Sequence, residues 1–142
     1  MGETFTAKAT VKINAPAAKV WEALTTPEIL KKFYFGADIV SDWKVGSPII
    51  YKGQWQGKSY EDKGVILTFE PGKLLATTHW SPLSGVPDSP ENYHKVTYEL
   101  SEKGGSTTVI LSQDNNATEE EKKQNDQFWN TMLDGLKKLL ES

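Results

Sequence analysis

Hydrophobic and polar residues follow two different periods along the chain. Near the C-terminus the apolar residues recur every three or four positions, which is the spacing of one helix face, so the pattern predicts a helix over 118–140. Thr118 and Glu121 are typical of an N-terminal capping box, and neighbouring glutamates suit the positive end of the helix dipole. The apolar stripe consists of Phe128, Trp129, Met132, Leu133, Leu136, Leu139 and Leu140.

The first third of the chain predicts one strand and two short helices. Apolar residues alternate over 4–13, which indicates a strand, and Asn14-Ala15-Pro16 ends it. Proline is favoured in the first turn of a helix, and the pattern predicts a helix over 16–25. Thr26-Pro27-Glu28 repeats this start signal for a second short helix, which ends near Gly36.

Between Ile39 and Asp114 the alternation changes to the period of strands. Glycine and proline separate the segments by short breaks, which favours hairpins and an antiparallel sheet. The expected strands are 37–42, 47–54, 60–70, 73–80, 93–102 and 106–114. The side chains expected to face the final helix are Val65, Leu67, Phe69, Tyr98 and Val109.

This order of elements predicts an α+β fold. A curved antiparallel sheet wrapped around the long C-terminal helix would bury both apolar faces at once, with the two short helices after the first strand. We expect the first strand to join the strands from the far end of the chain. The sequence shows no internal repeat or low-complexity linker, so we predict a single domain over 1–142.

Composition excludes several classes of function. The chain has no cysteine, which rules out disulfides, thiolate metal sites and a cysteine nucleophile. A formal net charge of −3 offers no basic surface for nucleic acid. No apolar run reaches the roughly 20 residues that span a bilayer, and the stretch from Met1 to Val11 lacks the apolar segment of a signal peptide. We therefore expect a cytoplasmic monomer or weak dimer that does not insert into membranes.

The sequence resembles the START-like helix-grip (SRPBCC) superfamily, and within it the family of activator-of-heat-shock-protein-ATPase homologues (AHSA-type). The resemblance extends over nearly the whole chain. Its segments are Val11 to Pro16, Val20 to Thr25, Pro27 to Leu30, Phe33 to Gly36, Ser41 to Gly46 and Gly57 to Gly64, together with Trp80 and the Phe128-Trp129 pair.

The resemblance implies a fold with a cavity between the sheet and the long helix. Relatives bind or act on lipids, hormones or polyketides, and one branch occurs in co-chaperones that stimulate a heat-shock ATPase and carry an additional N-terminal region. The 142 residues match the shared domain alone. We therefore expect small-molecule binding. Stimulation of a heat-shock ATPase, as part of a stress response, is an alternative hypothesis.

Few residues of the chain have the spacing of catalytic groups. His79 and His94 are the only histidines, and neither belongs to a metal-binding spacing, so we predict no catalytic residue, metal or cofactor. The pattern favours ordinary surface or cavity-edge histidines, although His79 could be a polar group inside a pocket. Glu61 and Asp62 are adjacent in a strand, so they point to opposite faces and cannot form an acid–base pair.

The aromatic residues provide the candidate binding site. Phe33, Tyr34 and Phe35 are consecutive and cannot all face one side, so at least one should lie at a cavity mouth or on the surface. Two interpretations of the interior stay open, which are a solidly packed core and an apolar pocket with a few polar groups. For the pocket we expect a lining of Phe33, Tyr34, Tyr51, Phe69, Thr78, Trp80, Tyr98, Trp129 and Met132.

The leading hypothesis is therefore the binding of a small hydrophobic molecule in a cavity between the sheet and the C-terminal helix. One alternative is a cyclase- or hydrolase-like enzyme with a pocket tyrosine or histidine as proton donor, which requires a buried polar pair. The co-chaperone role is the other alternative, and it predicts an exposed apolar patch. Along the final helix, we expect Leu136, Leu139 and Leu140 to be closed core and any cavity to open near Phe128, Trp129 and Met132.

Overall fold

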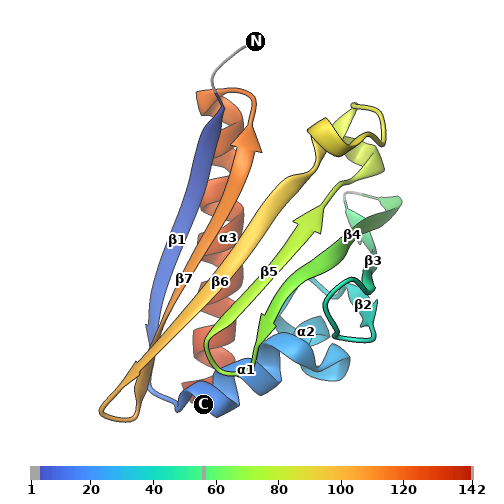
Figure 1. The fold of residues 1–142 in the computed structure, drawn as a ribbon. Coiled ribbons are helices and arrows are strands. Elements are labelled where there is room, and N and C mark those ends of the chain that lie inside the picture. Colours follow the sequence, from blue (N-terminus) through green and yellow to red (C-terminus); the bar gives the residue numbers. More distant parts are fainter. Residues whose placement is uncertain (1–3, 56, 142) are drawn as a thin grey trace.

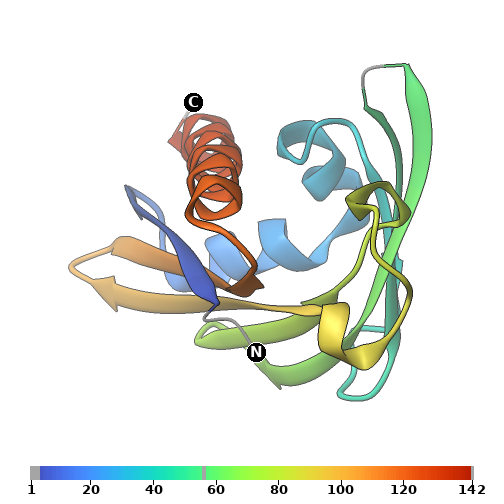
Figure 2. The same cartoon turned by 90° about the horizontal axis from the view of Figure 1, so that it is seen from above.

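The computed structural model describes residues 4–55 and 57–141, so the outermost residues of the predicted domain lie outside the described residues. A seven-stranded antiparallel sheet curves around one long helix, and two short helices close one end of it (Figures 1 and 2). The predicted α+β helix-grip fold is confirmed. The helices are α1 (Ala17–Thr25), α2 (Pro27–Phe33) and α3 (Glu119–Glu141). The strands are β1 (Phe5–Ile13), β2 (Asp38–Ser41), β3 (Pro48–Trp55), β4 (Lys58–Glu70), β5 (Leu74–His79), β6 (His94–Lys103) and β7 (Ser106–Asn116).

The strand order β1-β7-β6-β5-β4-β3-β2 follows from the short connections of the chain. Each strand from β2 to β6 pairs with the next one along the sequence, as expected for hairpins. The exception is β1, which pairs with β7, so the first strand joins the far end of the chain as expected. The proline-rich segment between β5 and β6 contains two short 3₁₀ turns, Pro82–Ser84 and Pro90–Asn92, which the sequence pattern did not indicate.

The C-terminal helix α3 lies on the concave side of the sheet (Figure 2). Its start is specified locally, because the backbone N–H of Glu121 donates to Thr118 Oγ1 over 3.0 Å. The Glu121 carboxylate in turn accepts a hydrogen bond from the backbone N–H of Ala117 at 3.3 Å, one residue before the position of an ideal capping box. The side chains of Trp129, Met132, Leu133 and Leu136 are buried against the sheet.

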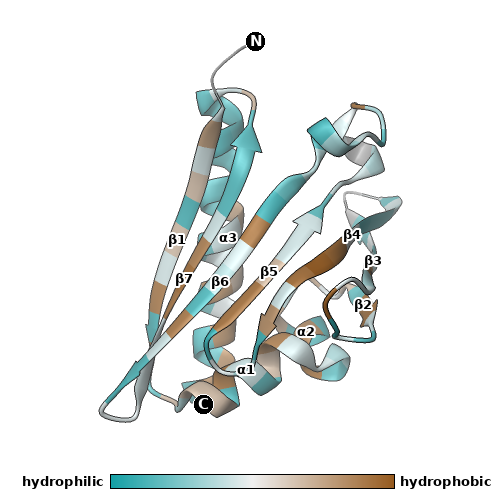
Figure 3. Ribbon diagram, in the orientation of Figure 1, coloured by the Kyte–Doolittle hydropathy of each residue, from teal (hydrophilic) through white to brown (hydrophobic). Residues whose placement is uncertain are grey.

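The register of β4 differs from the sequence prediction. Ile66 is buried and faces α3, whereas Val65 and Leu67 are 39% and 41% exposed on the convex side. The expectation that Val65 and Leu67 face the helix was therefore wrong. Figure 3 shows the hydrophobic stretch along β4. A register shift between Ile66 and Thr68 moves the next inward position to Phe69, which packs against the core.

Two glycines differ in the space that the fold leaves around them. A Cβ atom on Gly64 of β4 would lie 1.7 Å from the carbonyl oxygen of Thr78, because β4 and β5 approach closely at this point. A Cβ atom on Gly135 of α3 would lie 3.5 Å from Cβ of Phe33, which is ordinary van der Waals contact. The two positions therefore allow a matched test of the sheet geometry.

We expect Gly64→Ala to lower the free energy of unfolding by about 3 kcal/mol, since the added methyl group must push two strands apart. The matched variant Gly135→Ala should raise stability by up to about 1 kcal/mol, because alanine favours a helix and the space accepts it. Urea denaturation followed by circular dichroism measures both changes. Equal stabilities for the two variants would show that the close approach of β4 and β5 is absent.

Candidate functional site

The main candidate site is a groove of about 760 Å³ between α3, β4, β5 and the chain that follows α2. One wall is aromatic and the floor is polar. The aromatic lining residues are Tyr34, Phe35, Tyr60, Phe128 and Trp129. The polar lining residues are Asp62, His79, Ser81, Ser84, Gln113, Gln124, Asn125, Gln127 and Thr131.

The aromatic wall is assembled from the end of α2 and the middle of α3. The ring centroids of Phe35 and Phe128 lie 4.8 Å apart, and those of Phe128 and Trp129 also lie 4.8 Å apart in a T-shaped arrangement. Tyr34 packs edge-on against both Phe128 and Trp129 at 6.1 Å. Phe35 has a positive φ of 53° and is 39% exposed, which confirms that one aromatic residue of the 33–35 run lies at the surface of a groove.

The polar floor is built around His79 on β5 and Asp62 on β4. The Nε2 atom of His79 lies 3.0 Å from Oδ2 of Asp62, and the two side chains are 16% and 14% exposed. A carboxylate only accepts hydrogen bonds, so His79 donates through Nε2–H, and in the neutral ring its Nδ1 atom is left as an acceptor. Among the described residues, no donor reaches Nδ1 of His79 or Oδ1 of Asp62, although both atoms are buried.

The backbone explains why these two side chains meet. Lys63 pairs with Trp80 and Ile66 with Thr77, and Gly64 and His79 lie between these pairs on the two strands. Asp62 and His79 thus share the concave face, while Glu61 points away and lies 3.9 Å from Lys52. The prediction that Glu61 and Asp62 cannot pair is confirmed.

Three tyrosines lie near enough to Asp62 for its charge to act on them. Burial raises the pKa of Tyr34 well above its ordinary value, and the charges of neighbouring tyrosines and of Asp62 raise it further. Burial also raises the pKa of Tyr51 and of Tyr60, and Asp62 adds to both shifts. These hydroxyls therefore stay protonated at neutral pH.

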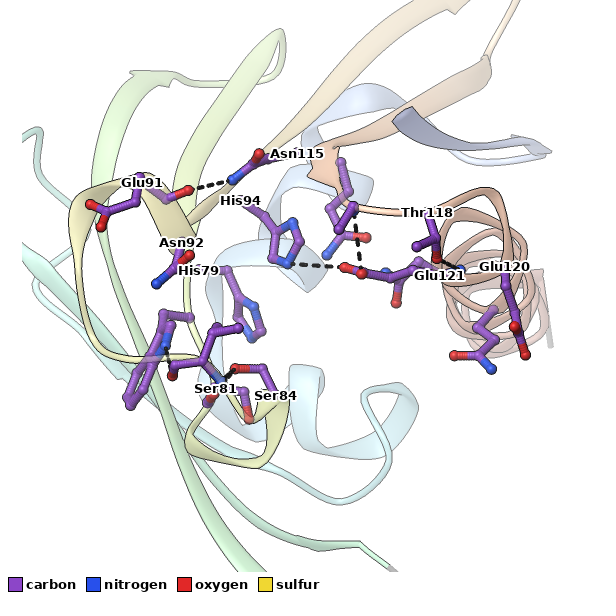
Figure 4. A pocket seen from close by; sticks show the side chains of 16 residues that line it. His79, Ser81, Ser84, Glu91, Asn92, His94, Asn115, Thr118, Glu120 and Glu121 are labelled. Atoms are coloured by element: carbon purple, nitrogen blue, oxygen red, sulfur yellow. Dashed lines mark hydrogen bonds and ion pairs between the residues drawn. The ribbon is translucent and has the colours of Figure 1, made fainter. Parts of the chain in front are cut away.

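A second, more polar pocket of about 520 Å³ continues the groove towards the start of α3 (Figure 4). It shares His79, Ser81, Ser84, Gln113, Gln124 and Asn125 with the first pocket. His94 is the direct cross-strand partner of His79. Its Nδ1 atom bonds to the Asp114 carbonyl at 2.7 Å, and its Nε2 atom faces Oε1 of Glu121 at 3.8 Å. Both histidines of the chain thus border one continuous groove.

A buried amide network holds α3 against β7 behind the groove. Trp129 Nε1–H donates to Oε1 of Gln113 over 2.9 Å. Asn125 donates to Oδ1 of Asn116 over 2.7 Å, and Asn116 in turn donates to the carbonyls of Phe5 and Gln113. These bonds satisfy buried polar groups and fix Trp129 in one orientation.

The nine residues expected to line a pocket are distributed over three environments. Tyr34 and Trp129 line the groove. Four are core residues, since Phe33, Tyr51, Tyr98 and Met132 are buried and the gap beside Tyr51 and Tyr98 is only about 20 Å³. The other three lie along the sheet, and of these Trp80 also lines the second, polar pocket. Phe69 packs on Trp21 at 5.1 Å, Thr78 accepts a hydrogen bond from Val65 N–H on the convex side, and Trp80 binds the Val86 carbonyl.

The residues missed by the sequence interpretation are the polar ones, chiefly Asp62, His79 as its partner, and Gln113. The signal that could have found Asp62 is the alternation Tyr60, Asp62, Gly64, Ile66 along one face of β4. Among the described residues, no three histidine, cysteine or acidic side chains come together in a way that could hold a metal ion. None of the helices within residues 4–55 and 57–141 has the length and apolar content needed to cross a bilayer.

The curved sheet that grips α3 defines a START-like protein. The chain belongs to the family described as "Activator of Hsp90 ATPase homolog 1-like protein", whose model matches residues 14–141. A comparison with curated proteins gave no match.

Solved structures with the same fold include one that is also similar to this chain in sequence. Protein ChR145 from Cytophaga hutchinsonii is 54% identical over 99% of this chain and 97% of its own, with a TM-score of 0.85. The Aha1 dimer from Colwellia psychrerythraea is 24% identical over 96% of each chain, with a TM-score of 0.75. DynU16, a protein of the dynemicin biosynthetic locus, is 19% identical over 96% of this chain and 47% of its own, with a TM-score of 0.80.

Trp129 is 3% exposed, so we expect Trp129→Ala to cost about 3–5 kcal/mol of unfolding free energy. Trp129→Phe should cost about 1–3 kcal/mol, because it leaves the buried Gln113 oxygen without its donor. Phe128→Ala serves as the control and should cost less than Trp129→Ala, since Phe128 is only half-buried. Chemical denaturation measures all three, and a cost below about 1 kcal/mol for Trp129→Ala would contradict the packing described above.

Proposed function

We propose that this protein binds a small amphipathic molecule in the groove between α3 and the concave face of the sheet. The observation that carries the proposal is the pairing of an aromatic wall with a polar floor across about 760 Å³. Binding sites for small molecules have volumes of roughly 300–1,000 Å³, mostly apolar walls and a few polar groups that fix orientation. The ligand would lie with a flat apolar part against the wall and a polar edge towards Asp62 and His79.

The exposure of the aromatic wall supports this proposal. Phe35 is 39% exposed, although an aromatic ring gains free energy by leaving water. Its φ of 53° belongs to a region that favours asparagine or glycine, so the backbone does not need a phenylalanine here. Phe35 is therefore an aromatic residue whose position is better explained by contact with a ligand than by folding.

The proposed binding residues divide into a contact layer and a supporting layer. Tyr34 and Trp129, from the predicted set, contact the ligand together with Phe35 and Phe128. Tyr51, Tyr98 and Met132 support them from the core, where they leave almost no free volume. Phe33 packs towards Gly135 of α3, Trp80 lines the adjoining polar pocket, and Phe69 and Thr78 line neither pocket.

The other two hypotheses stay predictions. A relative in a biosynthetic locus agrees with a small-molecule role, but at 19% identity it supports the fold alone. Stimulation of a heat-shock ATPase would need a partner surface, for which the exposed Val65 and Leu67 on the convex side are the candidates. Enzymatic turnover would need the Asp62–His79 pair to act on a bound molecule.

A variant of Phe35 tests the proposal without disturbing the core. Asparagine tolerates the positive φ at position 35, so we expect Phe35→Asn to keep its melting temperature within a few degrees of wild type. The matched control is Leu67→Asn, which removes a side chain of similar exposure (41%) from the opposite face. The probe is 6-propionyl-2-(dimethylamino)naphthalene, a neutral flat fluorophore whose emission shifts to the blue in apolar surroundings.

We expect wild type and Leu67→Asn to bind the probe alike and Phe35→Asn to bind it about tenfold more weakly, because the loss of a buried phenylalanine contact is worth roughly 1.5–3 kcal/mol. Fluorescence titration measures the three dissociation constants. Equal affinities for all three proteins would refute binding at the aromatic wall. Native mass spectrometry of the protein purified from its own cells would then identify the natural ligand.

A further inference from the structure

The buried polar pair beneath the groove has features that the packing of the fold does not explain. His79 and Asp62 are 16% and 14% exposed and bond to each other through one atom each. Each side chain has a second polar atom, which is Nδ1 in His79 and Oδ1 in Asp62. Both atoms are buried, and neither receives a hydrogen bond from the described residues. A buried polar atom without a partner destabilises a protein, so each one calls for an explanation, and a functional role is one of them.

The two atoms without a partner are both hydrogen-bond acceptors. In the neutral imidazole the Asp62 carboxylate fixes the proton of His79 on Nε2, so Nδ1 presents a lone pair. Oδ1 of an ionised carboxylate also only accepts. The floor of the groove therefore presents two hydrogen-bond acceptors.

The surrounding side chains do not supply the missing donors. The ring of Tyr51 approaches His79 edge-on, with centroids 5.3 Å apart, and no bond joins them. The residue of β4 directly opposite His79 is Gly64, which has no side chain. The lining of the groove contains no lysine or arginine.

We infer that Asp62 and His79 select ligands that carry an O–H or N–H donor on the edge of a flat aromatic or conjugated body. This inference rests on the proposed function and names the class of molecule that the groove takes. Both acceptor atoms are buried beneath the floor, so a donor reaches them only when the side chains around them move aside, which favours a small donor group. A ligand with a carboxylate or phosphate at this edge is disfavoured, because its charge would meet that of Asp62.

The test uses two probes that differ in one donor. Indole has an N–H group on a flat bicyclic ring, and 1-methylindole has a methyl group in its place. On hydrophobic grounds alone 1-methylindole should bind slightly more tightly, because it is larger and more apolar. We expect the opposite order in wild type, with indole bound about tenfold more tightly, since hydrogen bonds to charged groups contribute this much.

The variant that removes the acceptors is Asp62→Leu combined with His79→Phe. Replacing both members of a buried polar pair by apolar groups is often neutral or stabilising, so we expect this protein to fold. It should bind 1-methylindole at least as tightly as indole. His79→Gln is the conservative variant, because glutamine can donate to Asp62 and still present an acceptor, and it should keep part of the preference for indole.

Titrations followed by ¹H–¹⁵N NMR give the affinities and locate each probe through the amides of residues 34–36 and 128–129. Equal affinities of wild type for the two probes, with shifts in the groove, would overturn the donor selection and leave the proposed function intact. A preference for indole that persists in the double variant would do the same. Shifts in the groove from neither probe would overturn both.

Discussion

The structure depends on the burial of one face of α3 against the concave side of the sheet. The buried contacts begin at Trp129 and continue through Met132, Leu133 and Leu136. Hydrogen bonds fix the helix along β1, since Asp126 accepts from the Lys8 N–H at 2.8 Å and Lys137 donates to the Lys12 carbonyl at 2.8 Å. Apolar burial thus sets the depth of the helix, and these polar contacts set its position along the strand.

The same helix explains where the groove lies. The segment 119–127 contains only glutamate, lysine, glutamine, asparagine and aspartate, so it has no apolar side chain with which to seal the sheet. This polar part lies along β1 and β7 and sends no apolar side chain across to β4 and β5, so a groove is left between them. Phe128 and Trp129 mark the boundary between the two parts, so they form the aromatic wall at its closed end.

The sequence was sufficient to predict the elements and their order, because glycine, proline and capping residues mark nearly every boundary. It was insufficient to predict which face of β4 points towards the core, because Val65, Leu67 and Phe69 alternate as regularly as Tyr60, Asp62 and Ile66. A shift of one residue exchanges the two faces of a strand, and a bulge near Leu67 puts Phe69 on the face of Ile66. The predicted site followed the aromatic residues and therefore included core positions such as Tyr98, while the polar floor depended on that register.

The close approach at Gly64 connects the fold to the polar floor. Without a side chain at this position β5 lies against β4, and His79 reaches Asp62 across the strands instead of meeting a neighbour opposite. The pair then has two unsatisfied acceptors in a region where apolar side chains would pack without this cost. An apolar pair would serve the stability of the sheet better. The proposed ligand would offset this cost by donating to the pair, whereas Gln113 and Asn116 already use their hydrogen bonds to hold α3 in place.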